Sequence, residues 1–218
     1  MEPSAPRAVL WDLDGTLVDS GDLHFDSWRS VMAAEGVALT LEMFESTFGW
    51  KNEPILRLWL GESSDPARRE RIAEEKERAY RASLRAQGLD PLPGAREWVE
   101  KLHADGWRQA ICSSAPRANI QAVLDVTGLG HDFEVIVAAE DVTLGKPDPQ
   151  VFLIGAERLG VDPSRTIVVE DAAAGVEAAK RAGMRSIGVN ATVALDADIV
   201  VRSLEELTDA SWASLLNP

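Results

Sequence analysis

Short apolar runs alternate with helix-like segments over most of this chain, and this alternation limits the folds that it can adopt. The apolar runs often contain β-branched residues and lie at 8–11, 109–114, 133–139, 166–171, 185–190 and 197–201. Amphipathic segments that mostly end in glycine separate them, at 94–106, 118–128, 148–160 and 173–183. This pattern predicts an α/β fold, a doubly wound parallel sheet covered by helices. Such sheets bind ligands at the carboxyl ends of their strands.

Residues 20–92 break this rhythm because they contain no good strand candidate. They are instead typical of amphipathic helices, at 21–35, 41–48, 53–60 and 66–87. The last of these is charged around most of its circumference, which is typical of an exposed helix. We therefore expect a core domain formed by 1–18 and 93–218, and a helical cap domain, 19–92, that covers the strand ends. Asp19 and Ser20, with the linker at 90–94, are the expected hinge.

The composition argues against several classes of partner. The formal net charge of −14 and the absence of any Lys/Arg block predict neither a nucleic acid nor an anionic membrane as partner. A single cysteine, Cys112, excludes an internal disulfide and a thiolate metal cage. No run resembles a membrane span or a signal peptide, so the cytoplasm is the expected location. With a helical lid of this size we expect a monomer.

Two aspartates end the first apolar run, in the stretch LWDLDGT. Positions i and i+2 of a strand face the same side, so Asp12 and Asp14 can project from the carboxyl edge toward one point. Two carboxylates there are costly unless a cation or a proton lies between them. A turn or helix cap is the alternative, since Asp-Gly-Thr favours turns, but it leaves Asp12 unexplained.

Three later motifs accompany these aspartates, and together the four resemble the haloacid dehalogenase superfamily, in its phosphatase and phosphomutase branch. The later motifs are ICSSA with Ser113, LGKPDPQVF with Lys146, and IVVEDAAAG with Glu170 and Asp171. They occur in the family's order, and the resemblance covers nearly the whole chain. It implies a Rossmann-like core with an inserted all-helical cap, and a small phosphorylated molecule as the substrate.

The resemblance implies a role for each motif residue. Asp12 is the expected nucleophile, which becomes an aspartyl phosphate, and Asp14 is the expected general acid and base. Mg²⁺ is the expected cofactor, held by Asp12 and Asp171, by the backbone carbonyl of Asp14, and by Glu170 directly or through water. An aspartate at position 14 indicates a phosphate ester, because the leaving alcohol needs a proton that a halide does not need.

Ser113 and Lys146 are expected to hold the transferring phosphoryl group through a hydroxyl and an ammonium. Ser114 is expected to contact the substrate beside them. The alternatives are a helix cap for Ser113 and a surface position for Lys146. The peptide bond before Pro147 is predicted to be cis, as in some relatives.

Five residues of the cap are candidates for substrate binding: His24, Trp50, Lys51, Asn52 and Lys76. His24 resembles a mutase histidine that couples cap closure to proton transfer, although a packing role is equally open. Asn52 stands where the mutase loop presents an arginine, and an asparagine cannot make a bidentate charged contact. Lys76 lies where relatives place a substrate lysine, but a solvated surface position is an equal alternative.

The sequence thus predicts a Mg²⁺-dependent phosphatase that acts through an aspartyl phosphate on a small metabolite, preferably a sugar phosphate. Beta-phosphoglucomutase activity is the first alternative, since a sugar hydroxyl then replaces water. A phosphate-binding module without turnover is the second. The full set of motif residues argues against that module, since a non-catalytic protein has no need of Asp14.

Overall fold

The structure is a computed structural model that describes residues 5–189 and 194–216. Its centre is a six-stranded parallel sheet in the spatial order β3-β2-β1-β4-β5-β6. The strands are Ala8–Trp11 (β1), Arg108–Cys112 (β2), Val135–Val137 (β3), Thr166–Glu170 (β4), Arg185–Val189 (β5) and Ile199–Val201 (β6). The predicted parallel α/β sheet is confirmed. The last residue of the strand expected at 185–190 lies outside the described residues.

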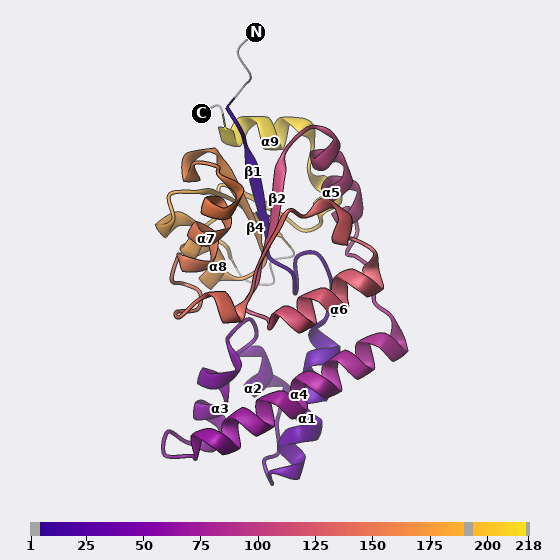
Figure 1. The fold of residues 1–218 in the computed structure, drawn as a ribbon, viewed down its shortest axis with the longest axis vertical. Coiled ribbons are helices and arrows are strands. Elements are labelled where there is room, and N and C mark those ends of the chain that lie inside the picture. The colour runs from indigo at the N-terminus through magenta and orange to yellow at the C-terminus, as the bar shows by residue number, and fades with distance from the viewer. Residues whose placement is uncertain (1–4, 190–193, 217–218) are drawn as a thin grey trace.

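Helices cover both faces of this sheet (Figure 1). The core helices are α5 (Ala95–Ala104), α6 (Arg117–Thr127), α7 (Gln150–Leu159), α8 (Ala173–Arg181) and α9 (Asp209–Leu216). Short 3-10 turns are η1 (Gly130–Asp132), η2 (Ala139–Asp141), η3 (Pro163–Arg165) and η4 (Leu204–Glu206). Among the described residues, no helix has the length and apolar character that crossing a membrane requires.

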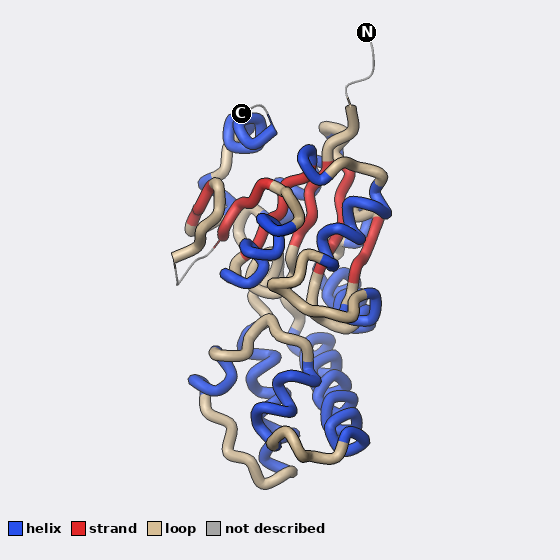
Figure 2. Tube along the Cα trace, turned by 90° about the vertical axis from the view of Figure 1, so that its left-hand side faces the viewer, coloured by secondary structure: helices blue, strands red, loops and turns tan. Residues whose placement is uncertain are grey.

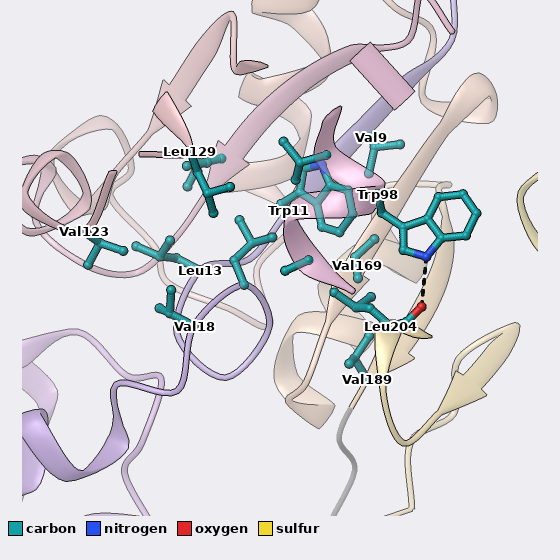
Figure 3. Packing of buried hydrophobic residues seen from close by; sticks show 14 of the residues in the cluster. Val9, Trp11, Leu13, Val18, Trp98, Val123, Leu129, Val169, Val189 and Leu204 are labelled. Atoms are coloured by element: carbon teal, nitrogen blue, oxygen red, sulfur yellow. Dashed lines mark hydrogen bonds between the residues drawn. The ribbon is translucent and has the colours of Figure 1, made fainter. Parts of the chain in front are cut away.

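Strand β1 is fully buried because β2 and β4 flank it and helices cover both of its faces. Val9 and Trp11 point into a cluster with residues of α5, α6 and α9, which Figure 3 shows. Ala8 and Leu10 point into the opposite cluster with residues of α7 and α8. Alternate residues therefore serve two cores, which explains why the run is apolar throughout.

Helix α9 is an element that the periodicity of the sequence did not predict. It is short, and Trp212 anchors it, with its ring centroid 6.0 Å from that of Trp11 and 5.4 Å from that of Trp98. The indole of Trp98 donates to the carbonyl of Leu204 at 2.9 Å (Figure 3). Packing of aromatic rings, rather than helical periodicity, thus fixes this end of the chain.

The cap consists of four helices between β1 and α5: α1 (Gly21–Ala34), α2 (Leu41–Glu45), α3 (Asn52–Leu60) and α4 (Pro66–Gln87). They enclose a hydrophobic cluster of their own, which includes Trp28, Phe44 and Ile72. Figure 2 shows them as a separate group of helices beyond one end of the sheet. The two connecting segments pair with each other, since Leu92 N donates to Leu17 O at 2.8 Å.

Helix α4 corrects one prediction from the sequence. Its charge pattern predicted an exposed helix, but it buries a stripe that includes Ile72, Lys76, Glu77 and Tyr80. This stripe faces α1 and α3, and α4 also packs against α6 of the core. The charged helix is therefore the main contact between cap and core.

Candidate active site

The loop after β1 brings both aspartates to the carboxyl edge of the sheet. Asp12 N donates to Val169 O at 3.0 Å, so the sheet fixes the backbone of Asp12. Gly15 then turns the chain with a φ of +91°, and a Cβ there would lie 2.1 Å from Asp171 Oδ2. Only glycine combines this conformation with so close an approach. Both aspartates line one pocket, as predicted, although each has its own partners.

Lys146 is buried between two carboxylates at the end of the pocket that residues of the core form, which we call the core end. Its Nζ donates to Asp12 Oδ1 and to Glu170 Oε1, at 2.5 Å each. Burial lowers the pKa of Lys146, but Asp12 and Glu170 raise it more, so its pKa stays well above the usual range. The alternative of a surface position for Lys146 is therefore wrong. The peptide bond between Lys146 and Pro147 is cis, which confirms that prediction.

Glu170 is held from several sides. Its Oε2 accepts from Ala172 N at 2.8 Å, while Oε1 binds Lys146. A Cβ on Gly175 would lie 1.9 Å from Glu170 Oε1, so the absence of a side chain there makes room for this carboxylate. Both oxygens of Glu170 thus have protein donors, and its observed contacts serve to hold Lys146.

Three carboxylates lie at the core end, and Lys146 is paired with two of them, Asp12 and Glu170. Asp171 forms no ion pair with any other residue that the structure describes. Burial first, and then repulsion from Glu170, raises the pKa of Asp171 to about 7. Burial likewise raises the pKa of Asp12 well above its usual value, despite Lys146. The core end therefore carries more negative charge than its ammonium offsets.

This excess of oxygen donors and negative charge fits a hard divalent cation such as Mg²⁺. In the described part of the chain, no three side chains of His, Cys, Asp or Glu are assembled as a metal cluster. The residues that the family resemblance assigns to the metal, and that do not serve to hold Lys146 alone, are Asp12 and Asp171, with the backbone carbonyl of Asp14. Mg²⁺ usually keeps several waters, so a set of this size suits it.

Asp14 lies in a separate hydrogen-bonded arrangement that leads into the cap. Ser20 Oγ donates to Asp14 Oδ1 at 2.5 Å, and His24 Nε2 lies 3.5 Å from the same oxygen. Lys76 Nζ lies 2.9 Å from His24 Nδ1. An ammonium can only donate, so Nδ1 accepts and the neutral His24 ring carries its proton on Nε2, facing Asp14. Burial raises the pKa of Asp14, but His24 and Ser20 lower it more, which keeps this carboxylate ionised.

Ser113 stabilises a local turn and also lines the pocket. Its Oγ accepts from Ala115 N at 3.1 Å, so it caps the turn that follows β2. It also lines the pocket together with Ser114 and Lys146. A capping serine at a strand end thus stands within the same pocket as Asp12.

Four of the five cap candidates line the pocket: His24, Trp50, Asn52 and Lys76. Lys76 is 2% exposed, so the alternative of a solvated position is wrong. Lys51 lies elsewhere, and the structure corrects its predicted contact with substrate. Its Nζ donates to the carbonyls of Ala139 and Val142 at 2.9 Å each, which ties the cap to the core.

Sequence reasoning missed Glu77, which also lines the pocket and is 6% exposed. The run of charges in α4 hid it. Ile72, Lys76, Tyr80 and Leu84 follow one another at intervals of four, and this spacing is the signal that could have revealed the buried face. Phe44, Phe48 and Ile55 add an apolar wall, in the manner of pockets for small ligands. The pocket has a volume of about 100 Å³, which is enough for several waters.

Comparison with known proteins agrees with this geometry. The family model for haloacid dehalogenase-like hydrolases matches residues 6–183. The chain is 34% identical to hexitol phosphatase B of Escherichia coli K12 over 217 residues, 94% of this chain and 97% of that protein. It is 31% identical to beta-phosphoglucomutase of Bacillus subtilis over 209 residues, 93% of this chain and 92% of that protein. The crystal structure of beta-phosphoglucomutase from Clostridium difficile superposes with a TM-score of 0.89 at 28% identity, covering 97% of each chain. The chain therefore belongs to the haloacid dehalogenase-like hydrolases, in the group that includes beta-phosphoglucomutases and sugar phosphatases.

Proposed function

We propose that this protein is a Mg²⁺-dependent phosphatase that hydrolyses a small phosphorylated sugar through an aspartyl phosphate on Asp12. One observation carries the proposal: two carboxylates face one pocket, the buried Asp12 beside Lys146 and the partly buried Asp14 beside Ser20 and His24. One group is placed to attack phosphorus and the other to move protons. The names of the relatives, which include a hexitol phosphatase, support the substrate class.

The first half-reaction forms a bond between Asp12 Oδ and phosphorus and breaks the ester bond to the sugar oxygen. That oxygen leaves with a proton from Asp14, so the sugar departs as a neutral alcohol. Asp14 is ionised in the free pocket, and a bound phosphate dianion raises its pKa by like-charge repulsion, which favours the protonated acid. His24, with its Nε2 proton toward Asp14, holds that carboxylate in place.

The second half-reaction returns both aspartates to their starting forms. A water attacks phosphorus and gives its proton to the Asp14 carboxylate, the bond to Asp12 breaks, and inorganic phosphate leaves. Lys146, Ser113 and Ser114 bind the phosphoryl oxygens from the other side. Asp12, Asp171 and the carbonyl of Asp14 would hold Mg²⁺, which would supply the charge that lets a carboxylate approach a phosphate.

We further propose that 1–18 with 93–218 and 19–92 are two domains that open and close about Asp19, Ser20 and the linker at 90–94. The separate hydrophobic cluster of the cap supports this division. The pairing of the two connecting segments through Leu92 and Leu17 supports a shared pivot.

Phosphomutase activity is the second candidate, and the 31% identity to a beta-phosphoglucomutase favours it. A mutase must hold a second phosphate while the first is transferred. Asn52, the residue expected at that place, is uncharged, and its amide donates to Glu77 at 2.7 Å. Hydrolysis is therefore the preferred reaction.

Release of inorganic phosphate from p-nitrophenyl phosphate and a panel of sugar phosphates tests the proposal. We expect turnover that requires Mg²⁺ and that falls by on the order of a thousandfold or more in Asp12→Asn. The same substitution at exposed Asp26 is the control. Absence of Mg²⁺-dependent release rules out the enzyme, whereas conversion of beta-glucose 1-phosphate to glucose 6-phosphate identifies a mutase.

A further inference from the structure

A buried carboxylate, Glu77, lines the pocket from the cap, and together with Asn52 and Lys76 it forms what we call the cap wall. Its Oε1 accepts from Asn52 Nδ2 at 2.7 Å and from Lys76 Nζ at 2.9 Å. Its Oε2 accepts from Nδ2 of Asn119, a residue of α6 in the core. Neither the predicted mechanism nor the motifs assign a task to this residue.

The charges on this wall cancel. Lys76 contributes one positive charge and Glu77 one negative charge, with their charged atoms 2.9 Å apart. His24 is neutral, because its Nδ1 accepts from Lys76. Arg81 lies behind Asn119, to whose Oδ1 it donates at 2.7 Å, and is not among the lining residues. Lys51, the other nearby cation, binds carbonyls of the core.

We propose that Glu77 determines specificity, by neutralising Lys76 so that the cap wall accepts an uncharged polyol and rejects a second phosphate. The proposal rests on the proposed phosphatase function and narrows its substrates to monophosphates of neutral sugars or sugar alcohols. It does not require Glu77 to take part in the chemistry.

Electrostatics explains the rejection. A second phosphate bound at this wall would lie beside a buried carboxylate, where little water screens the repulsion. Lys76 cannot turn fully toward that phosphate without leaving Glu77 as an unpaired buried charge, which is strongly unfavourable.

A hydroxyl group meets no such obstacle. It donates to a Glu77 oxygen or accepts from the remaining N–H groups of Lys76 and Asn52. Trp50 and Phe48, which line the same end, offer apolar surface to the carbon side of a sugar. The wall therefore matches a molecule that has many hydroxyls and one phosphate.

The test compares ligands that differ by one phosphate. Glucose 6-phosphate and glucose 1,6-bisphosphate, and the corresponding fructose pair, are titrated by calorimetry into Asp12→Asn protein in the presence of Mg²⁺. We expect the monophosphate to bind about tenfold or more tightly than the bisphosphate in at least one pair. We expect the double variant, with both Asp12→Asn and Glu77→Gln, to lose or reverse that preference. Glu74→Gln makes the same change at an exposed position of α4 and should leave the ratio unchanged.

Two results would overturn the proposal. The first is that Asp12→Asn protein binds the monophosphate no more tightly than the bisphosphate in either pair, or binds neither ligand. This result can be obtained even if the Glu77 variant does not fold. The second is a Glu77→Gln variant that melts as a folded protein and keeps the original ratio. Because binding is measured without turnover, failure here is distinct from failure of the phosphatase proposal, which phosphate release decides.

Discussion

The two ends of the pocket treat charge in opposite ways. At the core end, Lys146 faces an excess of carboxylates, and burial with repulsion from Glu170 raises the pKa of Asp171 to about 7. At the cap end, Lys76 faces Glu77 and the two charges cancel. The core end is thus suited to a further cation and a transferring phosphoryl group, whereas the cap end is suited to an uncharged part of the substrate. We therefore propose that reactivity belongs to the sheet edge and selectivity to the helical insertion.

Replacing the lysine of the core end should have the largest effect. Lys146→Met leaves Asp12 and Glu170 buried without their cation, so we expect the free energy of unfolding to fall by about 3–5 kcal/mol. Phosphate release should fall by on the order of a thousandfold. Urea denaturation and an aryl phosphate assay measure the two effects. Lys180→Met removes an exposed lysine, and a loss no larger than in that control would contradict the account.

Glycine 175 provides the second way to disturb the core end. Gly175→Ala places a methyl group within 1.9 Å of Glu170 Oε1, so this carboxylate and with it Lys146 must shift. We expect a loss of stability of about 1–3 kcal/mol and a lower kcat, measured by thermal melting and steady-state kinetics. Gly130→Ala is the matched control, because the nearest atom to its new Cβ is an ordinary 3.6 Å away. Equal effects of the two substitutions would mean that Glu170 is not held tightly.

The pH dependence of stability should expose the charge imbalance. Without Mg²⁺, the pKa of Asp171 is about 7 in the folded protein and near 3.8 in the unfolded chain. The folded state therefore binds more protons between these values, and stability should fall as the pH rises toward 7, by at most about 1.4 kcal/mol per pH unit for this one group. Above pH 7 the decline should end. Denaturation at several pH values with and without Mg²⁺ checks this, and a stability that rises over the same range contradicts it.

The smallest effect is expected where the cap meets the core outside the pocket. Lys51→Ala removes two hydrogen bonds to the carbonyls of Ala139 and Val142. Glu77 and Asn119 still join the two parts, so kcat/KM should fall only about fivefold, mainly through KM. Lys101→Ala, at an exposed position of α5, is the control for loss of a lysine. A large fall in kcat would place Lys51 in the chemistry instead.

Much of the core end could be predicted from the sequence because several of its residues follow apolar runs that are easily recognised, whereas Lys146 was predicted only through the resemblance of its GKPDP motif. Asp12, Ser113 and Asp171 come directly after strands, and parallel strands bring their carboxyl ends to one edge. The partners of each side chain could not be predicted. That Lys146 pairs with Asp12 and Glu170, while Asp14 faces Ser20 and His24, depends on packing between segments far apart in the chain.

The cap was harder to predict for a physical reason. Lys51 and Asn52 are neighbours in the sequence, yet one side chain reaches the core and the other the pocket. The direction of each side chain depends on the residue at which α3 begins, and local sequence patterns do not determine that residue. In α4, many exposed charges masked the buried pair Lys76 and Glu77, because a charge is normally a sign of exposure. Helix α9 is held by Trp212 rather than by periodicity, and so it was not found.

The central claim is that the core end transfers a phosphoryl group through Asp12. The most direct measurement is mass spectrometry of enzyme mixed with fructose 6-phosphate and Mg²⁺, quenched in acid, and reduced with borohydride to mark the acyl phosphate. We expect modification of Asp12 in the wild-type protein and none in Asp12→Asn or without Mg²⁺. Steady release of phosphate with a modification at another residue, or release that continues in Asp12→Asn at the wild-type rate, would contradict it.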